Sequence, residues 1–295
     1  MNNITRKLTY PFRVILRVIS PKAFVKLQYK TITGHELNLE NPVKYTEKLQ
    51  YLRLYAYPKD KLVCQCAGRV GVREYVKNKG YEKILIKTYG VFDSFDEIDF
   101  DALPTQCVIK TTHSSQMNYI IWDKFKEDWK KLKRLFNRYL RINYGRKTVE
   151  PHYTKINPQI LVEKLLLEEG TTPIEYKIHC FNGKAKSMYI VTGRGKDIRY
   201  TNYYIDWRRF DASQFNGWKS ADHDIRKPDN WEEMVKIAED LAAPFPFVRV
   251  DLYNINQRIY FSELTFTPAK GTLKFDDERA DYEMGEWLQI KTNEN

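Results

Sequence analysis

Two alternating runs joined by Asn182-Gly183 constrain the fold of this chain more than any other feature. Apolar and polar side chains alternate over residues 174–181 and again over residues 184–192. Asn-Gly is the dipeptide that most favours a two-residue turn between antiparallel strands. The pattern therefore predicts a β-hairpin.

A second hairpin is predicted closer to the C-terminus, from strands at Val248–Tyr253 and Arg258–Leu264. Asp251 and Glu263 fall on these strands. A connection of three or five residues centred on Gln257 would place them directly opposite each other on one face. Facing carboxylates repel unless a cation lies between them, and Mg²⁺ is commonly held by one or two carboxylates plus substrate phosphates. Both acids are therefore candidate metal ligands; the alternative is an acid pair on a solvated sheet face.

Helical patterns occur on both sides of a small unit at residues 106–164. This unit is predicted to contain strands at 106–111, 118–122 and 159–163 and a helix at 123–143, whose buried face would consist of Phe125, Trp129, Leu132, Phe136 and Leu140. The opposite face of that helix is rich in lysine and arginine. Further helices are predicted at residues 46–55, 70–78 and 230–243. Helices and antiparallel strands in separate stretches indicate the α+β class.

Positive charge is concentrated at the N-terminus. The net charge of the 295-residue chain is +11, and residues 1–35 contain no acid but seven basic residues: Arg6, Lys7, Arg13, Arg17, Lys22, Lys26 and Lys30. Pro11 is predicted to begin a short helix and Pro21 to end it. One face of this helix would carry Phe12, Ile15, Leu16 and Ile19, and another would carry Arg13 and Arg17. Such a segment suits an anionic membrane surface; the alternative is a core helix with a solvated basic face.

Several protein classes are excluded. No stretch approaches the ~20 apolar residues that a membrane-spanning helix needs. Phosphate-binding GxxxxGK[ST], dinucleotide-binding GxGxxG, HExxH and GxSxG motifs are all missing from the sequence. The four cysteines are predicted to be free thiols in a reducing, cytosolic compartment, because Cys64, Cys66, Cys107 and Cys180 have no disulfide or metal-ligand spacing.

Two strand lysines and one acidic tripeptide are further candidates. Lys110 and Lys177 lie within predicted strands. A lysine that points from an apolar strand into a cleft usually needs an anion such as phosphate, although edge-strand lysines also serve to discourage aggregation. Asp99-Phe100-Asp101 has the Asp-x-Asp pattern with which many glycosyltransferases hold a nucleotide-sugar and its metal; the alternative is a pair of solvated acids.

Six short segments, in this order, resemble the TupA-like branch of the ATP-grasp superfamily, which is linked with teichuronopeptide and polysaccharide biosynthesis. The likeness runs from about Asn41 to Gly285. The segments are Val72–Val76, Leu103–Pro104 with Val108–Lys110 and His113, Ile160–Glu163, Glu175–Lys177 with Cys180–Lys184, Val248–Tyr253 and Glu263–Pro268.

The resemblance implies an α+β ATP-grasp fold, in which two α+β lobes clasp ATP beside an N-terminal helical and α/β subdomain. It suggests an N-terminal subdomain at 41–105, a small lid lobe at 106–164 and a C-terminal lobe with the metal site at 165–295; the charge pattern adds a basic amphipathic segment at 1–40.

The resemblance also implies roles for single residues. Lys110 would contact the α- and β-phosphates of ATP, and the loop at 113–118 would cover the phosphates with His113, Ser114, Ser115 and Asn118. Glu163 and the backbone of Lys164 and Leu165 would hold adenine and ribose. The expected catalytic residues are Lys177, Arg194 and Arg249, the first two facing the γ-phosphate or a carboxylate. Asp251 and Glu263 would bind Mg²⁺.

Two features depart from the family pattern. The covering loop of the family is usually glycine-rich, whereas Ser114 and Gln116 occupy its glycine places here. Many ATP-grasp enzymes have an asparagine ligand two residues after the metal-binding glutamate, and this chain has Thr265.

The function implied is an ATP-dependent carboxylate–amine ligase that works through an acyl phosphate. Its expected partners are a uronic acid of a surface polysaccharide or precursor and an amino acid or amine, with no nucleic acid. We expect a cytoplasmic protein with peripheral contact at the inner face of the plasma membrane. The alternatives are a glycosyltransferase of capsule or exopolysaccharide synthesis that uses a nucleotide-sugar, and a non-catalytic polyanion-binding protein.

Overall fold

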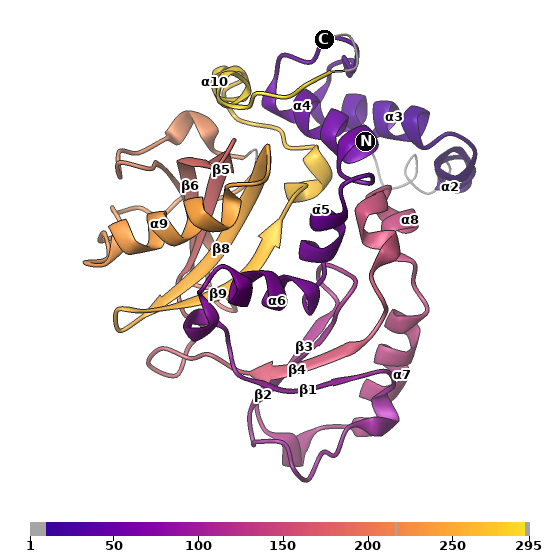
Figure 1. The fold of residues 1–295 in the computed structure, drawn as a ribbon, viewed down its shortest axis with the longest axis vertical. Coiled ribbons are helices and arrows are strands. Elements are labelled where there is room, and N and C mark those ends of the chain that lie inside the picture. Colours follow the sequence, from indigo (N-terminus) through magenta and orange to yellow (C-terminus); the bar gives the residue numbers. More distant parts are fainter. Residues whose placement is uncertain (1–9, 216, 293–295) are drawn as a thin grey trace.

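Two antiparallel sheets and the helices around them form the protein (Figure 1). The computed structural model describes residues 10–215 and 217–292. The large sheet has the strand order β7-β6-β5-β8-β9, and the small sheet has the order β1-β4-β2-β3. The predicted α+β class is confirmed.

The large sheet contains both predicted hairpins. Its strands are β5 (Glu175–Phe181), β6 (Lys184–Thr192), β7 (Arg199–Tyr204), β8 (Phe247–Ile255) and β9 (Arg258–Thr265). The Asn182-Gly183 turn is confirmed, with positive φ values of 48° and 79°. Strand β7 had no counterpart in the prediction.

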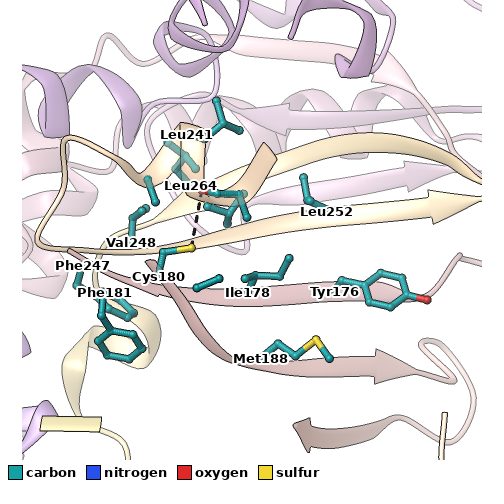
Figure 2. Packing of buried hydrophobic residues seen from close by; sticks show 14 of the residues in the cluster. Tyr176, Ile178, Cys180, Phe181, Met188, Leu241, Phe247, Val248, Leu252 and Leu264 are labelled. Atoms are coloured by element: carbon teal, nitrogen blue, oxygen red, sulfur yellow. Dashed lines mark hydrogen bonds between the residues drawn. The ribbon is translucent and has the colours of Figure 1, made fainter. Parts of the chain in front are cut away.

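One face of the large sheet is an apolar core. Figure 2 shows Ile178 and Cys180 of β5 packed with Val248 and Leu252 of β8. Helix α9 (Trp231–Ala242) contributes Leu241 to the same cluster. Alternation along β5 therefore sends Ile178 and Cys180 into this core and leaves Glu175, Lys177 and His179 for the opposite face.

The small sheet is formed by β1 (Thr88–Phe92), β2 (Cys107–Thr111), β3 (Asn118–Ile121) and β4 (Ile160–Lys164). Three of these strands match the predicted ones to within a residue or two. The fourth, β1, comes from outside residues 106–164 and pairs with β4.

Helix α7 (Trp129–Leu140) covers the small sheet with Leu132 and Phe136 buried. It is shorter than the predicted helix at 123–143. The side chain of Asp128 accepts a hydrogen bond from the backbone of Lys131 and so begins the helix, while residues 124–126 form a separate 3₁₀ turn. The prediction that Phe125 is buried was therefore wrong, because the side chain is 81% exposed on that turn.

Helices of the N-terminal half pack beside the sheets. They are α2 (Tyr10–Ile19), α3 (Pro21–Thr33), α4 (Tyr45–Tyr51), which continues as a π-helix at Leu52–Ala56, α5 (Lys61–Cys66) and α6 (Gly71–Asn78). The helix predicted between Pro11 and Pro21 is α2, which ends at Ile19, and Pro21 itself begins the next helix, α3. Proline is well accommodated in a first turn, and Ser20 caps this helix by accepting from the backbone of Ala23.

Two short helices complete the fold. Helix α8 (Tyr144–Thr148) follows α7, and α10 (Arg279–Trp287) packs against α4. Short 3₁₀ segments occur at Glu82–Ile84, Phe95–Glu97, Lys124–Lys126, Pro151–Lys155, Asp211–Ser213 and Pro268–Gly271. The four cysteines are free, as predicted, and all four are buried. Within the described ranges, no helix is long and apolar enough to cross a membrane.

Candidate active site between the two sheets

A β-bulge in the second hairpin places Asp251 opposite Glu263. The turn has only two residues, Asn256 and Gln257, and the ladder runs regularly from there to the Leu252–Phe261 pair. The register then shifts by one residue, so that Ser262 is unpaired and Glu263 faces Asp251. The predicted opposition of the two acids is confirmed, but it arises from the bulge and not from a three- or five-residue loop.

The carboxylate of Asp251 is buried among cations. The Arg249 guanidinium donates from Nε to Oδ1 at 2.6 Å and from Nη2 to Oδ2 at 2.7 Å. Lys177 on the neighbouring strand donates from Nζ to Oδ2 at 2.5 Å. Arg249 also donates to the hydroxyl of Tyr189 at 2.8 Å. These bonds compensate the cost of burying Asp251, whose exposed fraction is 1%.

Glu175 and Arg194 extend this network towards solvent. Lys177 Nζ lies 3.0 Å from Glu175 Oε2, and Arg194 forms an ion pair with Glu175 Oε1. Burial by itself would raise the pKa of Glu175, but Lys177 and Arg194 outweigh it and hold that pKa below its usual value. Burial likewise opposes the charged form of Lys177, yet Asp251 keeps the pKa of Lys177 above its ordinary value. Lys177 is therefore a cation that is largely shielded from water.

A polar row crosses the large sheet on the face opposite its core. In register, Asn202 of β7 pairs with Tyr189, Tyr189 with Lys177, Lys177 with Asp251, and Asp251 with Glu263. His179, which contacts this row, is held neutral: burial, together with Arg249 and Lys177, lowers its pKa to about 3.

The small sheet faces the large one with Lys110 and Glu163. Lys110 of β2 forms an ion pair with Glu163 of the neighbouring strand β4, and both side chains are largely buried. At the end of β4, the chain leaves the small sheet through Lys164 and Leu165, and it enters the large sheet at β5.

A cleft of about 260 Å³ separates the two sets of side chains. Its lining includes Arg69, Lys110, Ser115, Gln116, Asn118, Glu163, Lys164, Leu165, Glu175, Lys177, Arg194, Tyr253, Ser262 and Glu263. The structure thus brings together nine of the site residues predicted from sequence: Lys110, Ser115, Asn118, Glu163, Lys164, Leu165, Lys177, Arg194 and Glu263.

Four other predicted residues do not line this cleft. Arg249 and Asp251 lie beneath it, where the Asp251 carboxylate accepts hydrogen bonds from both Arg249 and Lys177. His113 and Ser114 are buried at the base of the covering loop, where His113 Nε2 lies 3.1 Å from the Ile142 carbonyl oxygen and Ser114 shares a hydrogen bond with Thr111. Burial lowers the pKa of His113.

Sequence reasoning missed Arg69, which holds the covering loop in place. Its guanidinium Nη1 donates to the carbonyl oxygens of Thr111 and Ser114, the latter at 2.7 Å, and its backbone N–H donates to Thr112. Gln116, in a glycine place of the family loop, has a φ of 63°, so the loop keeps a left-handed residue there. The only sequence signal for Arg69 is its position between Gly68 and Gly71.

Glu175 was also missed as a site residue, although a signal existed. It lies two positions before Lys177 on a strand, so both side chains must project from the same face.

The Asp-x-Asp pair has only a local role in the structure. Asp99 accepts hydrogen bonds from the backbone of Asp101 and Ala102, and neither acid lines the cleft.

The carboxylates next to the cleft suit a magnesium ion that arrives with a phosphate. In residues 10–215 and 217–292, no group of three or more His, Cys, Asp and Glu side chains is arranged to hold a metal. Glu263 lines the cleft and is 35% exposed, whereas both oxygens of Asp251 are bonded to Arg249 or Lys177. Two carboxylates on paired strands fit the usual protein share of a Mg²⁺ shell, with Glu263 the accessible one.

Comparison with known proteins agrees with this arrangement. The family model described as TupA-like ATPgrasp matches residues 47–289, which is most of the chain. None of the proteins with curated functions matches.

Solved structures also resemble the fold at low sequence identity. D-alanine–D-alanine ligase from Helicobacter pylori is 14% identical, with 85% of this chain and 68% of that one covered and a TM-score of 0.46. The Bacillus anthracis enzyme complexed with ATP is 13% identical (70% and 55% covered, TM-score 0.42), and L-amino acid ligase from Bacillus licheniformis is 11% identical (71% and 42% covered, TM-score 0.40). The chain thus spans about half the length of the last two.

These TM-scores lie below 0.5, so the assignment rests on the family match. That match covers the cleft, both sheets and every predicted site residue, and it confirms both the resemblance seen in the sequence and the ATP-grasp fold it implied. The chain belongs to the TupA-like family of ATP-grasp proteins.

Proposed function

We propose that this protein is an ATP-dependent carboxylate–amine ligase. The observation that carries the proposal is the convergence of Lys110 and Lys177, from two different sheets, on one cleft that also exposes Glu263. Two cations on opposite walls suit a polyphosphate chain, because each can neutralise part of the charge that develops during phosphoryl transfer.

In this proposal, the small sheet holds the nucleotide. Lys110 contacts the α- and β-phosphates, and Ser115 and Asn118 of the covering loop close over them. Glu163, with the backbone of Lys164 and Leu165, binds adenine and ribose at the crossing between the sheets. Residues 106–164 then act as a lid on the 165–295 lobe, and a closed lid excludes the water that would hydrolyse an acyl phosphate.

Glu263, supported by Asp251, would hold Mg²⁺. When bound, the ion neutralises negative charge on the phosphates. The placement of Arg249 indicates a supporting role, since it bonds Asp251 directly and reaches both Glu263 and Thr265 through Nη2 at 3.4 and 3.0 Å.

The reaction has two steps. A carboxylate oxygen of the acceptor attacks the γ-phosphorus, the bond between that phosphorus and the β–γ bridging oxygen breaks, and ADP leaves with the bond's electrons. The amine nitrogen then attacks the acyl carbon, phosphate leaves and the nitrogen loses a proton, which yields an amide. Lys177 and Arg194 face the cleft where the transferred phosphoryl group and the carboxylate would meet.

The acceptor is proposed to be a uronic acid of a surface polysaccharide or of its lipid-linked precursor, and the amine an amino acid. The family's link with polysaccharide biosynthesis supports this choice, and so does the net charge of +11, which favours acidic partners. A precursor of this kind would place the protein in the cytoplasm, with peripheral contact at the inner membrane face.

Trapping with hydroxylamine tests the proposal without knowledge of the amine. The full chain is incubated with Mg²⁺, ATP, hydroxylamine and one acid at a time, including glucuronate and galacturonate. We expect ADP release that depends on the acid, together with the corresponding hydroxamate detected by mass spectrometry. Amino acids in place of hydroxylamine should then give a product with the summed mass minus one water.

Variants at two strand lysines provide the matched control. Lys177→Met should lose hydroxamate formation, whereas Lys186→Met, on the exposed surface of β6, should retain it. Thermal unfolding followed by circular dichroism checks that both variants fold. Hydroxamate formation unaffected by Lys177→Met would contradict the assigned site. Turnover of nucleotide-sugars with no ATP consumption would instead support a glycosyltransferase.

A further inference from the structure

A segment outside the cleft has an unusual charge. Residues 129–149 contain no Asp or Glu, and all of their basic side chains are exposed: Lys130, Lys131, Lys133, Arg134, Arg138, Arg141, Arg146 and Lys147. They lie on the outer side of α7, opposite the buried Leu132 and Phe136, and on α8. Within the described residues, Lys133 alone among these eight forms an ion pair, with Asp96 at 2.6 Å.

Helix α2 carries large apolar side chains in water. Phe12 is 59% exposed, Ile15 56%, Val18 75% and Ile19 77%. Phe12, Ile15 and Ile19 follow the three- and four-residue spacing of one helix face. This exposure contradicts the alternative that Phe12, Ile15 and Ile19 pack on the protein core. Arg6 and Lys7 of the same basic segment lie outside the described residues.

These two features belong to one continuous edge. Arg17 of α2 donates from Nη1 to the carbonyl oxygen of Lys147 at the end of α8, at 2.8 Å. Figure 1 shows α2, α8 and α7 following one another along the same side of the molecule. We call the surface formed by α2, α7 and α8 the basic edge. None of its residues lines the cleft, so a partner at this edge would leave the cleft open.

We propose that the basic edge docks on an anionic lipid bilayer. The apolar face of α2 would enter the headgroup region, and the cations of α7 and α8 would lie over anionic headgroups. Ordinary solvation of α7 and α8 would account for their charge. It would not account for the four large apolar side chains that α2 exposes at one end of the basic edge. The combination of exposed apolar groups and many unpaired cations is what reversible interfacial binding requires. This inference does not depend on the ligase chemistry.

Flotation with lipid vesicles tests the inference. The full chain is mixed with vesicles of phosphatidylcholine and phosphatidylglycerol at 7:3, or with phosphatidylcholine alone. Binding is expected to the anionic vesicles only, and to fall steeply between roughly 0.05 and 0.5 M salt because screening weakens surface attraction. An absence of binding to anionic vesicles at low salt would overturn the proposal.

Three double variants locate the contact. Arg138→Glu/Arg141→Glu on the basic edge should lower partitioning roughly tenfold or more. Ile15→Ser/Ile19→Ser should lower it to a comparable degree. Lys79→Glu/Lys83→Glu makes the same charge change at exposed positions near the end of α6, away from the basic edge, and should retain most of the binding. Circular dichroism confirms that each variant is folded.

Two results would refute the proposal. If Arg138→Glu/Arg141→Glu and Lys79→Glu/Lys83→Glu weaken binding equally, the attraction reflects net charge and not this edge. If a soluble polyanion such as heparin binds as tightly as the vesicles, and Ile15→Ser/Ile19→Ser affects neither, the edge recognises polyanions and not a bilayer.

Discussion

At the scale of single residues, the covering loop depends on a side chain from another part of the chain. Arg69 ties the carbonyl oxygens of Thr111 and Ser114 together, and its guanidinium also faces the cleft. Side chains in two glycine places leave the loop fewer backbone conformations. Arg69 holds it in one of them through these two bonds.

Substitution of Arg69 should weaken ATP binding more than it slows catalysis. Hydrogen bonds from a charged donor contribute about 1.5–3 kcal/mol each, so Arg69→Ala should raise the KM for ATP about tenfold to a hundredfold. Arg69→Lys keeps the charge, but its ammonium lacks the fixed planar geometry of the guanidinium, and it should recover only part of the affinity. Steady-state kinetics and calorimetric ATP binding measure both. A KM within twofold of the native value in Arg69→Ala would contradict this role.

The Lys110–Glu163 ion pair leads to a second prediction. Lys110→Ala should abolish ATP-dependent activity, and it should also lower stability by a few kcal/mol, since Glu163 is buried and would lose its cation. The double variant Lys110→Ala/Glu163→Gln removes the unpaired charge. It should therefore regain stability in urea unfolding but stay inactive. If both variants unfold at the native urea concentration, the pair contributes nothing to stability.

At the scale of secondary-structure elements, a buried acid joins α10 to α4. Asp281 accepts from the backbone N–H of Thr46 at 2.9 Å and from its hydroxyl at 2.7 Å. Burial, only partly offset by these bonds, raises the pKa of Asp281 from 3.8 to about 6. The folded protein therefore binds a proton between about pH 4 and 6 that the unfolded chain releases.

This shift predicts a loss of stability as the pH rises. The contribution of Asp281 is most favourable near or below pH 4 and is lost as the pH rises through about 6, at a cost of roughly 2–3 kcal/mol. Asp281→Asn stays neutral at every pH. We expect the difference in unfolding free energy between this variant and the native chain to shift in favour of the variant from pH 4 to pH 7. A constant difference across that range, measured by urea titration, would contradict the assigned pKa.

At the scale of the whole molecule, ATP and Mg²⁺ should stabilise the fold together. A ligand that bridges both sheets binds only the native state, and at 100 times its Kd it adds about 2.7 kcal/mol, or a few degrees in Tm. Glu263→Gln should remove the part of this shift that depends on Mg²⁺, and so should a chelator. ATP alone should shift both proteins equally. A Tm shift in Glu263→Gln that still depends on Mg²⁺ would exclude Glu263 as a ligand.

Local patterns in the sequence were sufficient for much of the architecture. The Asn182-Gly183 turn, the strands on either side of it and the amphipathic core of α7 all depend on residues within a few positions of one another. Alternation with a period of two and recurrence every three to four residues encode such elements directly. The two-residue spacing of Glu175 and Lys177 is another local pattern, because it places both side chains on the same face of β5.

Other features depend on residues that lie far apart in the chain, so only the folded molecule determines them. Strict alternation from Ile259 and Phe261 would turn Glu263 into the core, and the bulge at Ser262 reverses this only because β9 pairs with β8 in one particular register. Arg69 reaches a loop more than 40 positions away. Register and contacts between lobes are selected by the packing of the whole molecule, so no local pattern contains them.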